Sequence, residues 1–594
     1  MFEDVMPGGG FLVADIPLGK VFSTEDLNET QKEFRDTARK FLANDVMPKG
    51  DAIENKELEG DKPLVLRLLK QAADIGMCSV DIPEEYGGLG MDKITSSVVA
   101  ESLAGCTSFG VTLGAHAGIG TLPIVYFGNE AQKKEWLPKL ASAELLSCYA
   151  LTEPAAGSDA LSGRAIAKSV EGGKAFLLTG EKQFITNGSW ADIAIVFAQV
   201  EGKYSAFIVD LRQKGVTRGA EEKKMGIKGS STTSLSFEDV RVPAENMLGA
   251  PGMAPQIALN ILNLGRFKLG FRALGDAKYA IDLTVKYASE RKQFGQPIVS
   301  FDMQKGHLAE MAADTYAIDS LAYRAVGDIE QALSGLKHDE TYAAKTIDVV
   351  RAYALECSIV KVAGGETLTD VVTKAICMHG GYGFIHEYQV ERVARDNVID
   401  NIYEGTNDIN RMTIFDTLAR NILGAGIPFR QFMERLDAAL REGKIRRTPG
   451  QGPLAEEIAD AIAAKQVAAY AINHAIIHCG KDVKNEQQVM EAAADVLIAL
   501  YKMDSTVARV AKISANGKGT AAHRAIAELV CHKNGQILAE KAREIVCSVT
   551  PAPQLAAKLA NLEKLTGLLG RPVNVVKTKR VIADAVVEAG AYRF

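Results

Sequence analysis

The strongest candidate for chemistry is a glutamate in the segment NIYEGTNDINRM, residues 401–412. Glu404 follows the aromatic Tyr403 and precedes Gly405, which allows another group to approach the backbone closely. An apolar neighbour disfavours the charged carboxylate and raises its pKa towards neutrality, where it can serve as a general base. Taken alone, the residue is better described as a solvated loop glutamate, because most glutamates are surface residues.

Two other segments combine a turn with groups that could face a ligand. In CYALTEPAAGSDA, residues 148–160, a strand is expected to end at Thr152, and the small residues 154–158 form a loop whose N–H groups can approach a planar or anionic ligand. The alternative is an ordinary β-turn. In EKQFITNGSW, residues 181–190, an aromatic and a hydroxyl side chain precede Asn187-Gly188. Alone, this pattern indicates a β-hairpin.

Several other classes of site are disfavoured. His474 and His478 are four residues apart, but Ala475 stands where an HExxH zinc site has glutamate, so we expect a structural role for both. The remaining histidines and cysteines show no metal-ligand spacing, and we predict no metal. A GxSxG elbow, a GxGxxG turn after a strand and a GxxxxGK[ST] loop are all absent from the sequence.

Composition indicates a folded, non-nucleic-acid-binding protein. The 594 residues are 47% hydrophobic and 24% charged with a net charge of −6, which argues against disorder and against a basic nucleic-acid surface. Eight scattered cysteines suggest reduced thiols. The acidic N-terminal segment resembles neither a signal nor a transit peptide, which predicts a cytoplasmic location of the bacterial type. Residues 102–129 lack charged side chains but are rich in small and polar ones, so we expect buried helix rather than a membrane span.

The order of elements predicts an α+β multidomain protein rather than a doubly wound sheet, because strands do not alternate with helices. An N-terminal arm at 1–27 precedes a helical domain at 28–145. Alternating β-branched and aromatic residues mark a β domain at 146–250. A helical bundle domain that carries Glu404 follows at 251–425, and an Ala-rich helical domain at 430–594 ends the chain.

Taken together, five motifs resemble the acyl-CoA dehydrogenase family over residues 25–425. They are LTEPAAGSD, ITNG, RKQFG at 291–295, GGYGF at 380–384 and YEGTND. The segments VTLGAHAGIG at 111–120 and LNILNLGRF at 259–267, together with the C-terminal helical block, are similar to the very-long-chain branch. Members of that branch are homodimers associated with a membrane surface, so the resemblance implies a homodimer with peripheral membrane contact.

The resemblance implies an acyl-CoA dehydrogenase-like fold: an N-terminal α-helical domain, a middle antiparallel β domain, an α-helical bundle and an extra C-terminal α-helical domain. It also implies α,β-dehydrogenation of an acyl-CoA to trans-2-enoyl-CoA, with FAD as cofactor and electron-transfer flavoprotein as electron acceptor. Glu404 would remove the α-proton, and the β-hydrogen would leave as hydride to flavin N5. Some family members place the base one residue before the arginine of the LNLGR segment, where this sequence has Gly265.

Other site residues follow by match to the family motifs. The FAD contacts implied are Tyr149, Leu151, Thr152, Gly157, Ser158, Phe184, Ile185, Thr186, Arg291, Gln293, Phe294, Cys377, Gly380, Gly381, Thr406 and Asp408. Those from RKQFG would reach FAD across a subunit interface. The substrate contacts implied are Ser158, Asn263, Arg266 and Gly405. Two of these positions depart from the pattern, since tryptophan is usual at Phe184 and glutamine is common at Cys377.

Acyl chain length can be argued from side-chain size. Medium-chain relatives close the pocket with bulky polar residues near the positions of Val111 and Ala115, which here are small and are followed by Gly118 and Gly120. Each buried CH₂ of substrate contributes about 0.8 kcal/mol, so we expect a long-chain preference.

Two alternative functions remain: an acyl-CoA oxidase that passes electrons to O₂, and a non-catalytic assembly or binding protein. Helices of the C-terminal block could also dock a membrane, although packing in a core or a dimer is the commoner use.

Overall fold

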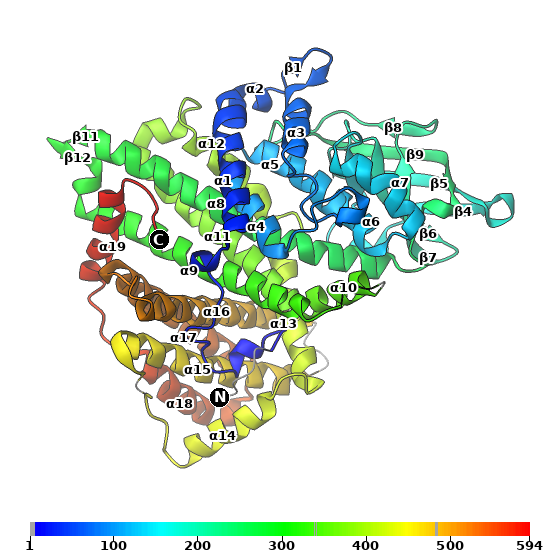
Figure 1. Ribbon diagram of the computed structural model, residues 1–594. Helices are drawn as coiled ribbons and strands as arrows, with labels where there is room; N and C mark the ends of the chain where they lie inside the picture. The colour runs from blue at the N-terminus through cyan, green and yellow to red at the C-terminus, as the bar shows by residue number, and fades with distance from the viewer. Residues whose placement is uncertain (1–5, 338, 340, 449, 481–484) are drawn as a thin grey trace.

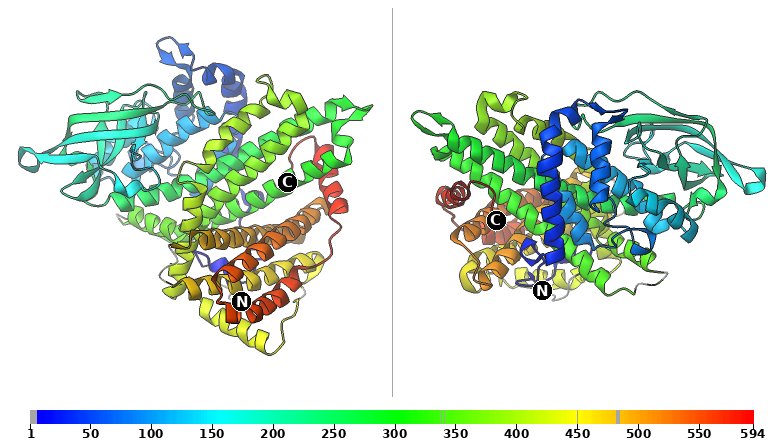
Figure 2. Two further views of the ribbon diagram at one scale, coloured as in Figure 1. Left: turned by 180° about the vertical axis from the view of Figure 1, so that it is seen from behind. Right: turned by 45° about the horizontal axis from the view of Figure 1, so that its top comes forward.

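The computed structural model describes residues 6–594 except 338, 340, 449 and 481–484, so the first five residues of the expected arm lie outside the described part. The described chain forms a helical domain, a β-sheet, a bundle of long helices and a second helical domain, in that order (Figure 1). The views agree that the sheet and the C-terminal helices lie apart, on different sides of the long helices (Figure 2).

The N-terminal domain is built from short helices. They are α1 (Glu29–Phe41), α2 (Gly50–Glu54), α3 (Leu64–Asp74), α4 (Lys93–Ser102), α5 (Thr107–Gly114), α6 (Leu122–Phe127) and α7 (Glu130–Ala141), with a small hairpin of β1 (Leu58–Glu59) and β2 (Lys62–Pro63). Helix α1 begins at Asn28, whose side chain accepts from the N–H of Gln31 in a capping box.

The uncharged stretch is helical and buried. Helix α5, a π-helical segment at Ala115–Gly120 and α6 run consecutively, and the span Thr107–Phe127 is long and apolar enough to cross a membrane. In the structure 83% of its most apolar window is buried inside the protein. The expectation of a buried helical region is therefore confirmed.

The middle domain is one eight-stranded sheet. Its strands are β3 (Ser147–Ala150), β4 (Ile166–Val170), β5 (Ala175–Thr186), β6 (Ile193–Val200), β7 (Lys203–Asp210), β8 (Val216–Arg218), β9 (Thr232–Pro243) and β10 (Met247–Leu248). They are ordered β10-β7-β6-β4-β5-β9-β8, with β3 paired to β6. Most pairs are antiparallel as expected, while β6 runs parallel to β3 and to β4.

Two local predictions in this domain are wrong. Strand β3 ends at Ala150, two residues before Thr152, because the chain turns there into the Glu153–Ala156 bridge. The Asn187-Gly188 turn does not make a β-hairpin, because β5 pairs with β4 and β9 rather than with β6. Asn187 instead adopts φ +65°, and its side chain donates to the carbonyl of Thr112 at 2.9 Å, so the turn joins the sheet to α5.

Long helices form the bundle. They are α8 (Ala254–Glu290), α9 (Asp302–Ser334), α10 (Tyr342–Ala352), α11 (Ala354–His379), α12 (Val390–Asn397) and α13 (Asn407–Leu423), and β11 (Lys292–Gln293) pairs with β12 (Gln296–Pro297) in a projecting hairpin. Helices α8 and α11 approach closely where Gly364 faces Gly270, since a Cβ on Gly364 would lie only 3.1 Å from the Cα of Gly270. Helix α8 also lines the candidate site described below.

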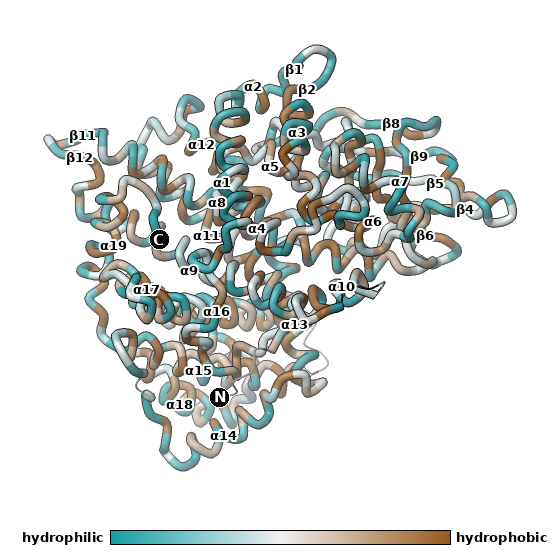
Figure 3. The backbone as a smooth tube through the Cα atoms, in the orientation of Figure 1, coloured by the Kyte–Doolittle hydropathy of each residue, from teal (hydrophilic) through white to brown (hydrophobic). Residues whose placement is uncertain are grey.

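The C-terminal domain adds α14 (Phe429–Arg441), α15 (Ala455–Cys479), α16 (Gln487–Ala515), α17 (Ala521–Val549), α18 (Ala552–Thr566) and α19 (Val575–Ala589). Hydrophobic and hydrophilic residues are interspersed along these helices (Figure 3). Helix α15 lies in the domain core, with Val467, Ala468 and Ala471 fully buried. His474 on this helix is buried and bonds to the carbonyl of Tyr470 at 2.9 Å, which agrees with the structural role expected for it.

The N-terminal arm is buried against the C-terminal domain. Within it, short 3₁₀ turns occur at Gly10–Leu12 and Thr24–Asp26. The Lys465 ammonium on α15 donates to the carbonyls of Phe11 at 2.7 Å and Ala14 at 2.9 Å. The ring of Phe11 packs 4.6 Å from that of Tyr501 on α16. The arm is therefore part of the core that the sequence assigns to the last domain.

Candidate active site

Glu404 lies in the loop between α12 and α13, and its side chain faces a cavity. The residue adopts φ +57°, a left-handed conformation that is uncommon outside glycine and that clusters at functional sites. Among the described residues, its buried Oε2 atom has no hydrogen-bond partner, and its backbone N–H donates to no carbonyl or side chain. Both groups are therefore free to meet a ligand in the cavity.

Burial raises the pKa of Glu404 to about 7, and the positive charges of Arg266 and Lys361 oppose that rise. A carboxylate with a pKa near neutrality is available both to take a proton and to return it. Burial thus raises the pKa of Glu404 towards neutrality, as predicted from the sequence.

The carboxyl group fits because the neighbouring residue on α8 has no side chain. A Cβ on Gly265 would lie 2.8 Å from Cδ and Oε2 of Glu404 and 2.9 Å from Oε1. Separations under 3.0 Å are not tolerated between such atoms, so any larger residue would displace the carboxyl group. One structural position thus holds either a helix side chain or the loop glutamate, but not both.

Two buried cations hold the backbone of this loop. Arg266 is only 5% exposed, and it donates to the carbonyl of Glu404 at 3.2 Å and to the side chain of Asn263 at 2.9 Å. Lys361 on α11 donates to the carbonyl of Gly405 at 2.9 Å and to Oδ1 of Asn407 at 2.6 Å. Burial lowers the pKa of Lys361 to about 8. These bonds fix the unusual backbone conformation at the candidate base.

A second network holds the loop from the preceding side. Arg272 on α8 donates to the hydroxyl of Tyr403 at 2.9 Å and to Asp276 at 3.0 Å, and it pairs with Asp400. The Tyr403 hydroxyl in turn donates to Asp400 at 2.9 Å. The sequence analysis did not single out Lys361, Arg272 or Asp400. A lone lysine in the apolar run SIVKVAGG, residues 358–365, is the signal that could have pointed to the first of them.

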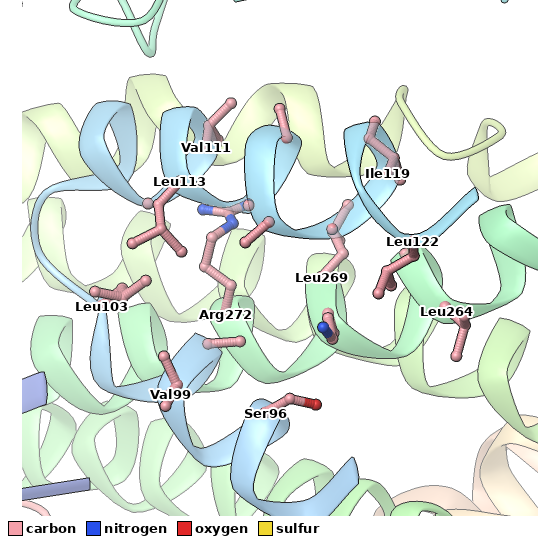
Figure 4. A pocket seen from close by; sticks show the side chains of 18 of the residues that line it. Ser96, Val99, Leu103, Val111, Leu113, Ile119, Leu122, Leu264, Leu269 and Arg272 are labelled. Atoms are coloured by element: carbon pink, nitrogen blue, oxygen red, sulfur yellow. The ribbon is translucent and has the colours of Figure 1, made fainter. Parts of the chain in front are cut away.

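The cavity has a volume of about 150 Å³. Its walls come from α4, from α5 and the π-helical segment after it, and from α8 (Figure 4). Thr186 at the end of β5 lines the cavity together with Glu404, and so do Val111, Ala115 and Gly118. Gly120 does not, because it packs against Ser147, whose Oγ would lie 2.5 Å from an added Cβ. The expectation that Gly120 enlarges the cavity is therefore wrong.

Most of the remaining predicted residues fall into two groups. In the first, Tyr149 is buried, its hydroxyl has no hydrogen-bond partner among the described residues, and burial together with the negative charge of Glu404 raises its pKa. A β-bulge after Lys182 gives Phe184 a φ of +58° and leaves its ring 63% exposed beside Thr186. Ile185 is buried, Leu151 and Thr152 precede the Glu153–Ala156 bridge, and Gly157 and Ser158 are exposed.

The second group lies just beyond the C-terminal end of α8 and around the end of α11. The 26 residues from Gly265 to Arg291 span about 39 Å of helix axis. There Arg291 stacks on Tyr382 of the GGYGF motif, with its guanidinium 5.5 Å from the ring centre, and the ring of Phe294 is 94% exposed. The other residues of this group, all exposed, are Gln293, Cys377, Gly380 and Gly381. One chain therefore does not bring them to Glu404.

Four further predicted contact residues lie near the Glu404 loop: Thr406 and Asp408 at α13, and Asn263 and Arg266 on α8. Thr406 is the N-cap of α13, where its hydroxyl accepts from the N–H of Ile409, and Asp408 in the first turn is exposed. Asn263 and Arg266 are buried beneath the Glu404 loop. Their proposed contact with CoA stays a prediction. The described residues include no group of three or more potential metal ligands.

Comparisons with known proteins agree over nearly the whole chain. Residues 28–144, 148–240 and 255–419 match the N-terminal, middle and C-terminal domain models of acyl-CoA dehydrogenases, and residues 463–564 match a further acyl-CoA dehydrogenase C-terminal domain model. A probable acyl-CoA dehydrogenase of Bacillus subtilis is 40% identical over 99% of both chains. The mitochondrial very long-chain specific acyl-CoA dehydrogenase of Bos taurus is 33% identical over 91% of this chain and 84% of its own.

Solved structures give the same result. An acyl-CoA dehydrogenase from Bacillus anthracis, crystallised in complex with FAD, has a TM-score of 0.95 and 40% identity over 99% of this chain and 100% of its own. Butyryl-CoA dehydrogenase from Megasphaera elsdenii has a TM-score of 0.60 and 33% identity over 67% of this chain and 99% of its own. The predicted resemblance and fold class are confirmed, and the chain belongs to the acyl-CoA dehydrogenase family of FAD-dependent oxidoreductases.

Proposed function

We propose that the protein oxidises long-chain acyl-CoA thioesters to trans-2-enoyl-CoA, with Glu404 as the base. The observation that carries this proposal is the Glu404 carboxyl group itself. It is buried against Gly265, faces the cavity with a partnerless oxygen, and has its pKa raised by burial to about 7. An α-proton of a thioester is a weak acid, so its removal needs a base fixed in place and an environment that stabilises the developing enolate.

The chain's own groups supply both requirements. Arg266 and Lys361 fix the loop backbone, so the carboxylate does not have to be ordered when the substrate arrives. The N–H of Glu404 donates to no other described group, which suits it to the thioester carbonyl oxygen. Exclusion of water by the bound acyl chain strengthens that hydrogen bond as negative charge develops on the oxygen. The proton leaves the α-carbon for the Glu404 carboxylate.

Three of the predicted contact residues fit FAD. Phe184 offers an exposed aromatic face, Thr186 offers a hydroxyl at the cavity wall, and an added Cβ at Gly157 would meet nothing within 4 Å. FAD, when bound, supplies the acceptor for the hydride that leaves the β-carbon. Phe184 and Thr186 would hold its ring system, while Gly157 leaves room for it next to the backbone.

A homodimer explains the second group of residues. Arg291 and Phe294 lie about 39 Å of helix away from Gly265, beyond the reach of a cofactor bound beside Glu404 of the same chain. The exposed ring of Phe294 and the neighbouring exposed Phe384 suit a protein contact. In a dimer the hairpin of one copy would reach the cofactor of the other, with Arg291 directed to the pyrophosphate.

Electron-transfer flavoprotein is the proposed acceptor of the electrons from FAD. The cytoplasm is the proposed location of the protein.

The cavity wall supports a long-chain substrate. Val111 and Ala115 are small, and an added Cβ at Gly114 or Gly118 would meet nothing within 4 Å. The wall formed by α5 and the π-helical segment therefore leaves room for methylene groups. The similarity to the long-chain enzyme of Bos taurus fits this reading.

Anaerobic mixing of the FAD-loaded enzyme with palmitoyl-CoA tests the proposal. We expect rapid bleaching of the flavin absorbance in the wild type, and FAD binding without bleaching in Glu404→Gln. Rapid bleaching by that variant would refute the assignment of the base. Measurement of kcat/KM from C8 to C18 tests chain length, and a maximum at C8 or below would refute the long-chain preference. Stoichiometric peroxide in aerobic turnover would instead favour an oxidase.

A further inference from the structure

The cavity wall formed by α5 and the π-helical segment after it (Figure 4) contains nearly every residue of one stretch. Within residues 113–119, six of the seven residues line the cavity, and only His116 does not. An α-helix presents about three or four of every seven residues to one side. The segment Ala115–Gly120 is π-helical, and Gly118 departs from helical geometry at φ −92° and ψ −106°. The wall therefore depends on a backbone geometry that ordinary α-helical winding does not provide.

The side chain of His116 joins this wall to two other elements. It is fully buried, and its Nε2 atom lies 3.0 Å from the carbonyl oxygen of Leu140 on α7. Its Nδ1 atom lies 3.2 Å from the backbone nitrogen of Ser147, the first residue of β3. Because a carbonyl oxygen only accepts, Nε2 carries the proton and Nδ1 accepts from the Ser147 N–H. One side chain thus ties the π-helical segment both to α7 and to the sheet.

Two hydroxyl groups hold the backbone of the same residue. The carbonyl of His116 accepts from Oγ1 of Thr121 at 2.7 Å and from Oγ of Ser147 at 3.1 Å. Thr121 and Ser147 are fully buried as well. Gly120 permits this packing, because an added Cβ there would lie 2.5 Å from the Ser147 hydroxyl oxygen. Loss of one of these bonds would leave a buried polar group without a partner, which disfavours the present geometry of the segment.

The imidazole of His116 is neutral near pH 7. Burial lowers its pKa to about 4, so the ring offers one donor and one acceptor, which is the form that its two partners require. The side chain is enclosed by protein and does not line the cavity. His116 can therefore act on a bound substrate only through the wall that it holds.

We propose that His116 is a positioning residue that holds the π-helical segment in the geometry of the cavity wall and thereby favours long acyl chains over short ones. This inference rests on the proposed function, which requires an acyl chain in the cavity. A longer chain places more methylene groups in the cavity and so has more contacts to lose when a wall moves. Removal of the anchor should therefore impair long substrates more than short ones.

The test compares kcat/KM for palmitoyl-CoA and butyryl-CoA in the FAD-loaded enzyme. Burial of each methylene group contributes a factor of about four, so loss of two such contacts lowers kcat/KM by about 15-fold. We expect His116→Leu to lower the palmitoyl-to-butyryl ratio of kcat/KM by about 15-fold or more. A defect of folding alone would reduce the amount of active enzyme, which changes both values equally and leaves the ratio as it is.

Two further variants isolate the hydrogen bonds. Asparagine matches leucine in shape, but its side-chain oxygen can accept from the Ser147 N–H, so His116→Asn should keep the ratio within about fourfold of the wild type. Should His116→Leu fail to fold, Thr121→Val serves instead, because it removes only the hydroxyl on the His116 carbonyl; its ratio should fall by about fourfold.

A matched control is a second buried histidine. His474 on α15 bonds to the carbonyl of Tyr470 at 2.9 Å, as His116 does to that of Leu140, but it does not line the cavity and lies in the C-terminal domain. We expect His474→Leu to leave the palmitoyl-to-butyryl ratio unchanged, even where it lowers the melting temperature.

The outcomes separate the two proposals. An unchanged or increased ratio in a folded His116→Leu or Thr121→Val enzyme overturns the positioning role while leaving the proposed function intact. An equal fall of the ratio in His116→Leu, His116→Asn and His474→Leu overturns it too. If no acyl-CoA bleaches the wild-type flavin, the proposed function fails and this inference fails with it. A lowered ratio in His116→Leu that asparagine largely restores supports the inference.

Discussion

Replacement of Gly265 by alanine should impair catalysis without impairing the fold. The added Cβ would lie 2.8 Å from the carboxyl carbon of Glu404, whereas ordinary contact begins at 3.4 Å. The carboxyl group must therefore move by about 0.6 Å or more, and displacements of about 1 Å at a reacting group reduce rates by about 100-fold. We expect flavin reduction by palmitoyl-CoA to slow by a factor of about 10 to 100 in Gly265→Ala.

The thermal stability of Gly265→Ala should not fall together with its rate of flavin reduction. Gly265 lies inside α8, where alanine is favoured over glycine by about 1 kcal/mol, which offsets part of the strain at the carboxyl group. Stopped-flow absorbance under anaerobic conditions measures flavin reduction, and thermal unfolding measures stability. Gly306 provides the control, because it also lies inside a helix, α9, and an added Cβ would meet nothing within 4 Å. Wild-type reduction rates in Gly265→Ala would refute the proposed packing of the base.

Four further results are expected. The rate of flavin reduction should rise with pH and level off above about 7, because only ionised Glu404 accepts a proton. The pKa of Glu404 in the folded protein exceeds its unfolded value of 4.5, so the ionised side chain should lower the stability of the protein above pH 4.5. Thermal unfolding should therefore show Glu404→Gln to be more stable than the wild type at pH 8 but not at pH 4. Lys361→Met should move the midpoint of that pH–rate profile upward, since a cation that favours the carboxylate is lost; an unchanged midpoint would contradict its assigned influence. Arg291→Ala should weaken FAD binding measured by flavin fluorescence, although it lies about 39 Å of helix from Gly265; unchanged affinity would argue against a shared cofactor site. Phe11→Ala should lower the free energy of unfolding by about 3 to 5 kcal/mol, measured by denaturant titration, because its ring is buried against Tyr501.

Local signals in the sequence predicted the elements, and the family resemblance identified the candidate base, but neither predicted the long-range contacts. The aromatic and glycine neighbours of Glu404 are compatible with a base, but only the resemblance of YEGTND to the family motif distinguished this residue from a solvated loop glutamate. Lys361 and Arg272 reach the same loop from helices 44 and 131 residues away, and no local pattern records such a contact. Asn187-Gly188 has the composition of a hairpin turn, yet pairing of β5 with β9 decides its structure. Tertiary context overrode local preference in each of these cases.

The placement of the arm imposes an order on the synthesis of the protein. Lys465 and the carbonyl of Phe11, which it binds, are 454 residues apart in the chain. On a ribosome the sheet and the first helices can form as they emerge, but the leading segment has no partner until α15 and α16 have been made. Until then its apolar side chains remain accessible to chaperones or to other nascent chains. Completion of the native structure is thus a late event that joins the N-terminal arm to the C-terminal domain.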